Sequence, residues 1–503
     1  MENNKIKLPM LSIIYILMFM IAVMNISDFL NSSMLVHIKS GEWILDNMKI
    51  PQNDIFAFGG TKEWINYYWL TDVVYAVLYR NFGIGSILIL SAVLMASSFT
   101  VVSYFLYKKN VNVFLILLFL VVSLYSSLPQ WSAVPYTFTL FFTVIYIFML
   151  EKFYDTGLKK YILFIAVLQI VWTNMNSEFF YPFVILFIYG ITDLYGIFMK
   201  EKESLERIKK TAVLFCITIP LIFVNPYGIK EITNVFSSYI FLIKDRRNDW
   251  AAPDFHGFAK MSNILLAFSI LMIGMFRKKS IKENRRYVLL YLVAVFVFLY
   301  AQRYIALYSV MTFYFVPMFL ERDDRIKLPI LNKFIDKTAV ISGVVYNSLS
   351  GKFINLFLIF IITTIFFVNI RYSEHYFHEI ISKWSRSAGV KYLAENKMYG
   401  RGFHSDSTGD MIIWYNYPKM KVFVDTREGV YEWQHQNKYG KIMQIKDDWE
   451  KVIKNEKIEW ILLQKGTLSN ILKLLKNDWK IEYEEERVII FKKIKSNGKG
   501  EEK

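Results

Sequence analysis

Apolar runs of about 17–25 residues recur along this chain of 503 residues, which is 54% hydrophobic. A helix of that length crosses the hydrocarbon core of a bilayer. The sequence therefore predicts an α-helical polytopic membrane protein. We expect eleven spans, at about 8–27, 83–107, 111–127, 132–151, 161–175, 180–199, 211–226, 262–277, 287–301, 304–320 and 353–371.

The chain has a net charge of +16, and most of its Lys and Arg residues lie between the apolar runs. Clusters of Lys and Arg precede the first predicted span and follow every second one, so the positive-inside rule places all of them in the cytoplasm. The clusters include Lys5, Lys7, Lys108, Lys109, Lys159, Lys160, Lys200, Arg207, Arg285, Arg286, Arg322 and Lys337. The N-terminus is then cytoplasmic, and an odd number of spans leaves everything after 371 outside. Because these charges set topology, we expect phosphate-bearing lipids, and no nucleic acid, as anionic partners.

A long external loop is expected at 28–82, within a membrane domain at 1–371. It is too polar to span a bilayer and too aromatic for a solvated linker. Residues 33–48 and 68–79 mix apolar and charged positions, as interfacial amphipathic helices do. Pro51 and the pair Gly59–Gly60 break the segment between them. The alternative is a loop whose aromatic side chains only sit at headgroup level.

The sequence of the tail, residues 372–495, predicts a small α/β domain outside the cytoplasm. Short apolar runs predict strands, and polar segments with helical periodicity lie between them. The strands are VFVD at 422–425, WILL at 460–463 and VIIF at 488–491, and the helices are at 380–396, 447–455 and 467–477. We expect VFVD and WILL to be adjacent strands of one sheet, Asp425 and Arg427 to pair for structural reasons, and 496–503 to be disordered.

Three residues of the external loop are candidates for the site, two for acid–base chemistry and one for substrate binding. Asp28 follows the first predicted span, where a carboxylate can activate an acceptor at the membrane surface or cap the next helix. Asp54 lies in the turn-like PQND, so a turn role competes with a catalytic one. His37 lies in an amphipathic segment, where a substrate-binding role competes with plain packing.

Four further residues are candidates for substrate binding. Arg246 and Arg247 lie in a charged external run, and guanidinium groups suit phosphate oxygens. The alternative there is a solvated run with internal salt bridges. Arg303 lies in a nearly continuous apolar stretch, and an ionisable residue inside a membrane bundle is a functional hypothesis by default, here phosphate binding. The alternative is an arginine at a span end that only extends its guanidinium to the interface. Glu178, between the fifth and sixth spans, points to the same external side, although a tight turn explains it equally well.

This arrangement resembles the GT-C class of membrane glycosyltransferases, and in particular an uncharacterised bacterial group within it. That group's first loop reads like DxDxWWH, followed by a glycine, a W-I pair and I-P-x-x-D-x-F. The matching residues here are His37, Gly41, Trp43, Ile44, Ile50, Pro51, Asp54 and Phe56, with further counterparts at Trp69, Leu70, Asp249, Trp250, Pro253, Asp254, Phe255, Arg303, NPYG at 225–228 and VFVD-T-R at 422–427. The resemblance covers most of the chain.

The chain also departs from that group. The acidic pair before WWH falls on Asn31 and Ser33, and the histidine usual after the fifth span falls on Asn176. In GT-C enzymes a carboxylate in the first loop is the expected catalytic base. The resemblance therefore implies Asp28 or Asp54 as the base, or an activity that has been lost.

The resemblance implies transfer of a sugar from a polyprenyl-phosphate carrier to an extracytoplasmic glycan, lipid or protein acceptor, with no separate cofactor. Sequence motifs identify no metal site, and the single Cys216 excludes a disulfide framework. Two alternatives remain: a non-catalytic relative that binds a lipid-linked glycan or a partner, and a lipid or glycan transporter. Against transport, the chain shows no repeated halves.

Overall fold

The computed structural model describes residues 15–16, 18–21, 31–59, 63–111, 113–245, 250–254, 266, 284–322, 387–427, 429–475 and 478–494. Most of this part is helical, with one small sheet near the C-terminus. The chain divides into two compact units. Unit 1 comprises Met1–Phe29, Ile87–Ile229 and Leu242–Asn369, and unit 2 comprises Leu30–Ser86, Lys230–Phe241 and Ile370–Lys503.

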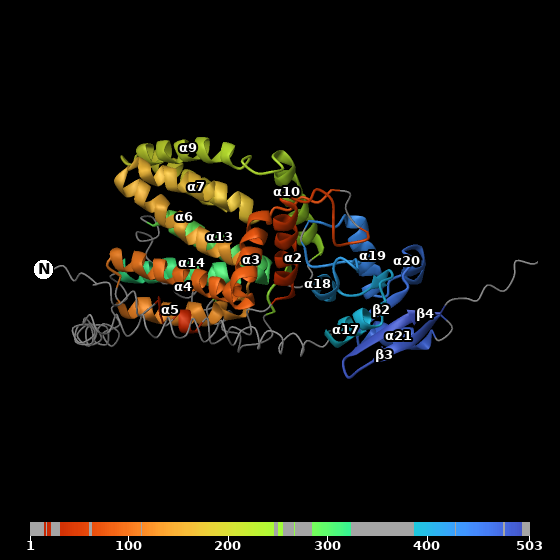
Figure 1. The fold of residues 1–503 in the computed structure, drawn as a ribbon. Coiled ribbons are helices and arrows are strands. Elements are labelled where there is room, and N and C mark those ends of the chain that lie inside the picture. Colours follow the sequence, from red (N-terminus) through yellow and green to blue (C-terminus); the bar gives the residue numbers. More distant parts are fainter. Residues whose placement is uncertain are drawn as a thin grey trace, which may run out of the picture. The chain divides into compact units, whose positions relative to one another are not determined.

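Unit 1 is a bundle of apolar helices (Figure 1). In chain order its described helices are α4 (Ile84–Lys108), α5 (Val113–Ser127), α6 (Tyr136–Thr156), α7 (Lys159–Met175), α8 (Tyr181–Phe198), α9 (Ser204–Leu221), α13 (Arg285–Tyr300) and α14 (Ile305–Arg322). Short 3-10 turns at Leu128–Gln130 and Gln302–Tyr304 connect α5 to α6 and α13 to α14. Helix α6 ends where Gly157 takes a positive φ of 66°, which glycine adopts without strain. The helices pack in pairs, α5 on α14, α6 on α7, α8 on α9 and α13 on α14.

Three helices in the described part of the chain, α4, α6 and α8, are long and apolar enough to cross a membrane. The outer surface of the bundle agrees with this, because large apolar side chains there are open to solvent. Val121, Leu163, Phe187 and Phe296 are each at least 60% exposed. Exposed apolar surface on this scale needs lipid or a partner to cover it. The expected spans at 8–27, 262–277 and 353–371 lie largely or wholly outside the described residues.

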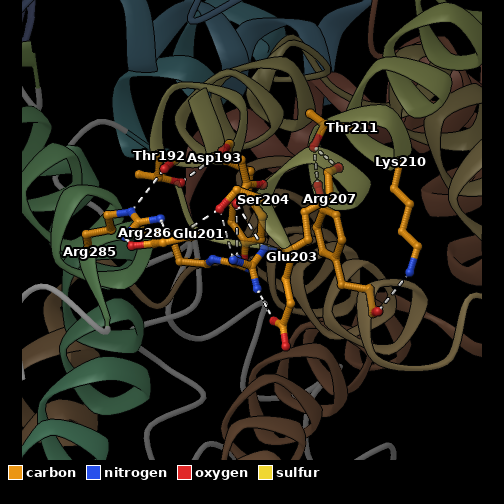
Figure 2. A network of polar contacts seen from close by, with 12 residues as sticks. Thr192, Asp193, Glu201, Glu203, Ser204, Arg207, Lys210, Thr211, Arg285 and Arg286 are labelled. Carbon is orange, nitrogen blue, oxygen red and sulfur yellow. Dashed lines mark hydrogen bonds and ion pairs between the residues drawn. The ribbon is translucent and has the colours of Figure 1, made fainter. Parts of the chain in front are cut away.

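One end of the bundle collects the basic clusters and holds together through ion pairs (Figure 2). Arg285, which begins α13, lies 2.6 Å from Glu201 of the α8–α9 connection. Arg207 of α9 lies 3.1 Å from the buried Asp193 of α8. Lys210 Nζ donates to the Tyr154 carbonyl of α6 at 3.1 Å. Three of the basic segments that the positive-inside rule assigns to one side, at the end of α6, at the α8–α9 connection and at the start of α13, are therefore joined at one end of unit 1.

Unit 2 begins with a tight helix pair, α2 (Ser32–Asn47) and α3 (Trp69–Phe82). Asn31 caps α2, because its side-chain oxygen accepts the Ser33 N–H at 3.0 Å. The two helices cross at Gly41, where a Cβ would lie 1.9 Å from the Asp72 carbonyl oxygen. Only glycine allows this approach. Residues 230–241 of α10 (Ile229–Asp245) also belong to this unit.

The rest of unit 2 is the expected small α/β domain, drawn in blue in Figure 1. Its sheet has the order β1-β2-β4-β3, with β1 parallel to β2 and the other pairs antiparallel. The strands are β1 (Gly402–Phe403), β2 (Trp460–Gln464), β3 (Trp479–Glu484) and β4 (Val488–Lys493). The helices are α17 (Ser387–Glu395), α18 (Asp406–Asn416), α19 (Trp433–Met443), α20 (Trp449–Asn455) and α21 (Thr467–Leu474). The predicted strands WILL and VIIF are confirmed, and they pair with each other through Ile461 opposite Phe491.

The prediction that VFVD lies beside WILL is wrong. Both edges of β2 are occupied, one by β1 and the other by β4. Val422 instead makes a parallel bridge to Ala57 of the first loop. The Val422 N–H donates to the Phe56 carbonyl at 2.9 Å, and the Phe58 N–H donates to the Val422 carbonyl at 3.1 Å. The backbone of Val422 therefore pairs with the first loop, while the ring of Phe423 packs on Phe403 of β1 and on Phe58 of the first loop, with centroids 5.3 and 5.9 Å apart.

Candidate functional site

A buried imidazole–carboxylate pair lies where α2 meets α3. His37 Nδ1 is 2.6 Å from Asp72 Oδ1, and Asn66 Nδ2 donates to Asp72 Oδ2 at 2.8 Å. All three side chains are buried. The close crossing at Gly41 creates the pair, because His37 lies one turn before Gly41 on α2 and Asp72 lies one turn before Ala76 on α3. An imidazole held by a carboxylate in this way is a common general-base arrangement.

A second polar cluster in unit 2 centres on Arg427. Its guanidinium lies 2.9 Å from Asp54 Oδ1 and 2.7 Å from Asp425 Oδ2, and Tyr431 Oη donates to Asp425 at 2.7 Å. The guanidinium also stacks over Trp64, 4.4 Å from the ring centre. Burial alone lowers the pKa of Arg427, but the two carboxylates outweigh it and hold that pKa above its usual value. The expected structural pairing of Asp425 with Arg427 is confirmed.

The surroundings of Asp54 identify it as a turn residue. Its Oδ1 accepts the backbone N–H groups of Phe56 and Ala57 at 2.9 and 3.3 Å, in addition to the ion pair with Arg427. Aspartate commonly stabilises a turn through such bonds. The two backbone N–H groups and the Arg427 guanidinium all use the same oxygen, Oδ1, and they hold the side chain in the turn.

A small cavity lies between the two clusters of unit 2. Its volume is about 10 Å³, which is close to the minimum that holds one water molecule. His37, Asp72, Asn66, Ser40 and Arg427 contribute to its lining, together with Trp64, Ile65, Tyr67 and Tyr68. Within the described part of the chain, Ser40 Oγ and Arg427 Nη1 are buried without a hydrogen-bond partner. The cavity therefore offers two polar atoms, Ser40 Oγ and Arg427 Nη1, that have no hydrogen-bond partner among the described residues.

Unit 1 holds another buried ion pair, at the end opposite its basic loops. Arg303, between α13 and α14, lies 3.3 Å from Glu178, between α7 and α8. Glu178 is fully buried, and Thr139 Oγ1 donates to it at 3.3 Å. Three rings surround the guanidinium, with Trp250 nearest at 4.4 Å and Tyr136 and Tyr304 at 5.6 and 5.9 Å. The structure thus brings together two residues that the sequence singled out separately.

The remaining predicted site residues have different outcomes. Asp28, Arg246 and Arg247 lie outside the described residues. His37 and Asp54 both belong to unit 2, whereas Arg303 and Glu178 belong to unit 1. The expected approach of Asp54 to Arg303 stays a prediction.

Sequence reasoning did not select Asp72, Asn66 or Ser40 as site residues. Asp72 carried a usable signal, since it is the single carboxylate in the apolar helical run WLTDVVYAV. Ser40 and Asn66 carried none, because polar residues of their size are common in loops and helices. Among the described residues, no group of three His, Cys, Asp or Glu side chains gathers as a metal site.

No protein-family model matches the chain, and no curated protein matches it at a significant level.

Proposed function

We propose that this chain is a multi-pass cell-membrane glycosyltransferase with about eleven spans, which moves a sugar from a polyprenyl-phosphate carrier to an extracytoplasmic acceptor. In this proposal the N-terminus is cytoplasmic and the tail domain is extracytoplasmic. The acceptor is a glycan, a lipid or a protein.

The observation that carries the proposal is the position of Arg303 in unit 1. Its guanidinium is buried at the end of the bundle opposite the basic loops, in contact with Glu178 and three aromatic rings. Ionisable residues buried in membrane bundles mark substrate paths, and guanidinium groups match phosphate oxygens in shape and charge. This is the end at which a lipid phosphate would lie outside the cell.

The chemistry follows from that placement. An acceptor group attacks the anomeric carbon while a base removes its proton, and the polyprenyl phosphate leaves. Arg303 stabilises the negative charge that develops on the departing phosphate. The carrier is anchored in the membrane, so the enzyme needs no nucleotide-binding fold. The resemblance assigns the base to Asp28 or Asp54, and the contacts of Asp54 favour a structural role for it.

One observation favours a second candidate, a non-catalytic protein that binds a lipid-linked glycan. Asp54, the carboxylate that matches the related group, is held in a turn and neutralised by Arg427. If no other base serves, sugar transfer is lost and lipid binding remains.

Lipid binding tests the proposal first. Mass spectrometry of lipids that co-purify with the protein should find a polyprenyl phosphate, and purified protein should bind polyprenyl phosphate more tightly than phosphate-free polyprenol. Arg303→Ala should weaken binding by roughly 2–3 kcal/mol, the range for hydrogen bonds to charged groups. Equal binding of the phosphate and the alcohol by the wild type would rule out the carrier.

Two matched variants guard against misfolding. Arg303→Ala leaves Glu178 buried without its cation, so the double variant Arg303→Gln with Glu178→Gln removes both charges together. Arg80→Ala removes a surface guanidinium that pairs with Asp46, and it should bind the carrier as the wild type does.

A further inference from the structure

We propose that the small cavity of unit 2, between the His37–Asp72 pair and the Arg427 cluster, is a binding site for one neutral water molecule. The water accepts a hydrogen bond from Arg427 Nη1, donates one to His37 Nε2 and forms a third with Ser40 Oγ. It thereby joins helix α2 to the tail domain. All of these residues belong to unit 2, and the inference does not depend on sugar transfer.

The size of the cavity limits its ligand to one heavy atom. Its volume of about 10 Å³ is close to the least that holds a water molecule, and a sugar, phosphate or carboxylate group does not fit. Apolar cavities stay dry, whereas a cavity lined by several unsatisfied polar groups holds water. The polar atoms of the lining therefore decide what occupies the cavity.

Arg427 supplies a hydrogen-bond donor to the cavity. Its Nε donates to Asp425, and its Nη2 donates to both Asp54 and Asp425, at 2.7–2.9 Å. Nη1 carries two hydrogens and is buried without a partner among the described residues. A buried donor that stays unsatisfied is costly, so this atom favours a ligand that accepts a hydrogen bond. Ammonium and metal cations cannot accept one, and they are excluded.

His37 supplies an acceptor. Asn66 Oδ1 accepts the Tyr68 backbone N–H at 3.1 Å, so Asn66 Nδ2 is the atom that faces Asp72. The Asp72 carboxylate lies 2.6 Å from His37 Nδ1 and only accepts, so Nδ1 carries the hydrogen. Nε2 of the neutral ring is then an acceptor, and no described residue hydrogen-bonds to it. The ligand must therefore donate, which excludes chloride and other bare anions.

Ser40 supplies the third polar atom. It follows His37 by three positions on α2, so the two side chains lie on the same face of the helix. Its Oγ is buried in the lining without a partner among the described residues, and a hydroxyl group can donate or accept. Water accepts and donates at once with a single heavy atom, and about three hydrogen bonds are usual for a buried water molecule.

The bound water forms a further link between the first loop and the tail domain. The other two links are the Ala57–Val422 backbone bridge and the Asp54–Arg427 ion pair. The water differs from both because it reaches the inner face of α2 through Ser40. A change at Ser40 therefore tests this link while the other two stay in place.

The first test is an experimental density map of the full-length protein in which ordered water molecules are resolved at other buried sites. One peak should lie within hydrogen-bond distance of Ser40 Oγ, Arg427 Nη1 and His37 Nε2. It should disappear in Ser40→Val, whose added methyl group fills the cavity. An empty cavity in the wild type, or a direct hydrogen bond between Ser40 and Arg427, would overturn the proposal.

Ser40→Ala distinguishes a hydroxyl group bonded to water from one that has no partner. Removing an unsatisfied hydroxyl is neutral or stabilising, whereas removing a bonded one loses its hydrogen bond. Exchange of the α2 amide hydrogens should become about five-fold faster, which corresponds to one hydrogen bond of about 1 kcal/mol. Unchanged or slower exchange in α2 contradicts the water site.

Ser309→Ala is the matched control. Ser309, on α14, is also buried with its Oγ unpartnered among the described residues, but it does not line this cavity. Both variants gain the same helix propensity from alanine. Amide exchange in α14 should therefore stay the same or become slower. Equal loss of protection around both serines would show that the effect does not come from the cavity, and the proposal would fail.

A measurement on the wild type needs no variant. In ¹⁵N-histidine NMR near neutral pH, His37 should carry its hydrogen on Nδ1 and none on Nε2. A hydrogen on Nε2 removes the acceptor and overturns the proposed set of bonds. These tests do not involve turnover, so a protein that proves not to be a glycosyltransferase leaves the water site standing.

Discussion

The imidazole of His404 in unit 2 is buried and satisfied only in its neutral form. Its Nε2 accepts the Phe423 N–H at 3.1 Å, and Nδ1 lies 2.9 Å from the Ser405 carbonyl, which accepts its hydrogen. Burial lowers the pKa of His404 to about 4. The folded value is below the unfolded one of about 6.5, so this group's stabilisation is full above pH 6.5 and is lost as the pH falls towards 4.

Asp410, on α18, changes the stability of unit 2 with pH in the direction opposite to His404. Its carboxyl group is fully buried, and burial, followed by the nearby Asp425, raises its pKa to about 8. The folded value is above the unfolded one, so its contribution is full below about pH 4 and is lost as the pH rises through 8.

These two groups predict the pH dependence of unit 2. Between pH 4 and 6.5 their slopes cancel, and from 6.5 to 8 stability should fall by roughly 1.4 kcal/mol per pH unit. Asp410→Asn should remove the part of that fall that is due to Asp410 and expose the rise due to His404 between pH 4 and 6.5, while Glu231, whose pKa burial raises to about 9, keeps its own contribution. Hydrogen exchange of the amides at 402–426 across this pH range measures both effects.

Asp447→Asn, which changes an exposed carboxylate, should leave the pH dependence as it is. A wild-type profile that rises steadily from pH 6.5 to 8 would contradict the assignment of Asp410.

Arg427 joins two buried carboxylates of unit 2, one from the first loop and one from the tail domain. Arg427→Met should destabilise the unit by roughly 3–5 kcal/mol, because Asp54 and Asp425 are left as buried charges without their cation. Arg487→Met, at an exposed arginine, should change stability by no more than about 0.5 kcal/mol. Denaturant unfolding followed by tryptophan fluorescence compares them, and equal losses would show that the buried network contributes little.

For individual residues, the distance between two partners along the sequence decided whether their pairing was predictable. The pairing of Asp425 with Arg427 was predictable because they are two positions apart in the sequence. The pairing of Asp54 with Arg427 was not, because they are 373 positions apart and no local pattern joins them. The role of Asp72 depends on a helix crossing that a single sequence does not reveal.

The α2–α3 crossing gives a prediction for these elements. Gly41→Ala places a Cβ 1.9 Å from the Asp72 carbonyl oxygen and 2.8 Å from the Ala76 Cβ, so the helices must separate. We expect a loss of roughly 1–3 kcal/mol, typical of overpacking, and loss of the His37–Asp72 contact. Thermal unfolding measures the first effect and the ¹⁵N signal of His37 the second.

Gly440→Ala is the matched control. Gly440 lies within α19 with nothing within 4 Å of an added Cβ, so alanine should be neutral or stabilise by up to about 1 kcal/mol. If both variants behave alike, the close crossing does not hold the pair.

Apolar periodicity predicted whole elements well where it was strong. The expected 161–175 appears as α7 and the expected 447–455 as α20. Helix α19 went unpredicted because its sequence is mostly polar. Helix α18 went unpredicted because its apolar residues are consecutive rather than spaced with a helical period, and β1 because two residues show no period. VFVD had the composition of a strand, but composition does not choose a partner.

The arrangement of the whole molecule across the membrane is open to a direct test. In a Cys216→Ser background, a membrane-impermeant maleimide added to intact cells should label Glu450→Cys in the tail domain. It should label Lys202→Cys, in the α8–α9 connection, only after lysis. A reporter that needs an extracytoplasmic location, fused after Lys495, should be active. Labelling of Lys202→Cys in intact cells would reverse the proposed orientation.

The discontinuous make-up of unit 2 has a consequence for its biosynthesis. The Ala57–Val422 bridge and the Asp54–Arg427 ion pair join the first loop to a segment made more than 360 residues later. At about 5–20 residues per second, the ribosome needs roughly 20–70 s to reach that segment. During this interval the emerging loop carries Asp54, Phe56 and Trp64 without their final contacts, and the protein relies on the cell to protect it from proteases and from other nascent chains. Truncation anywhere before Arg427 therefore leaves an early loop, as well as a late domain, unfinished.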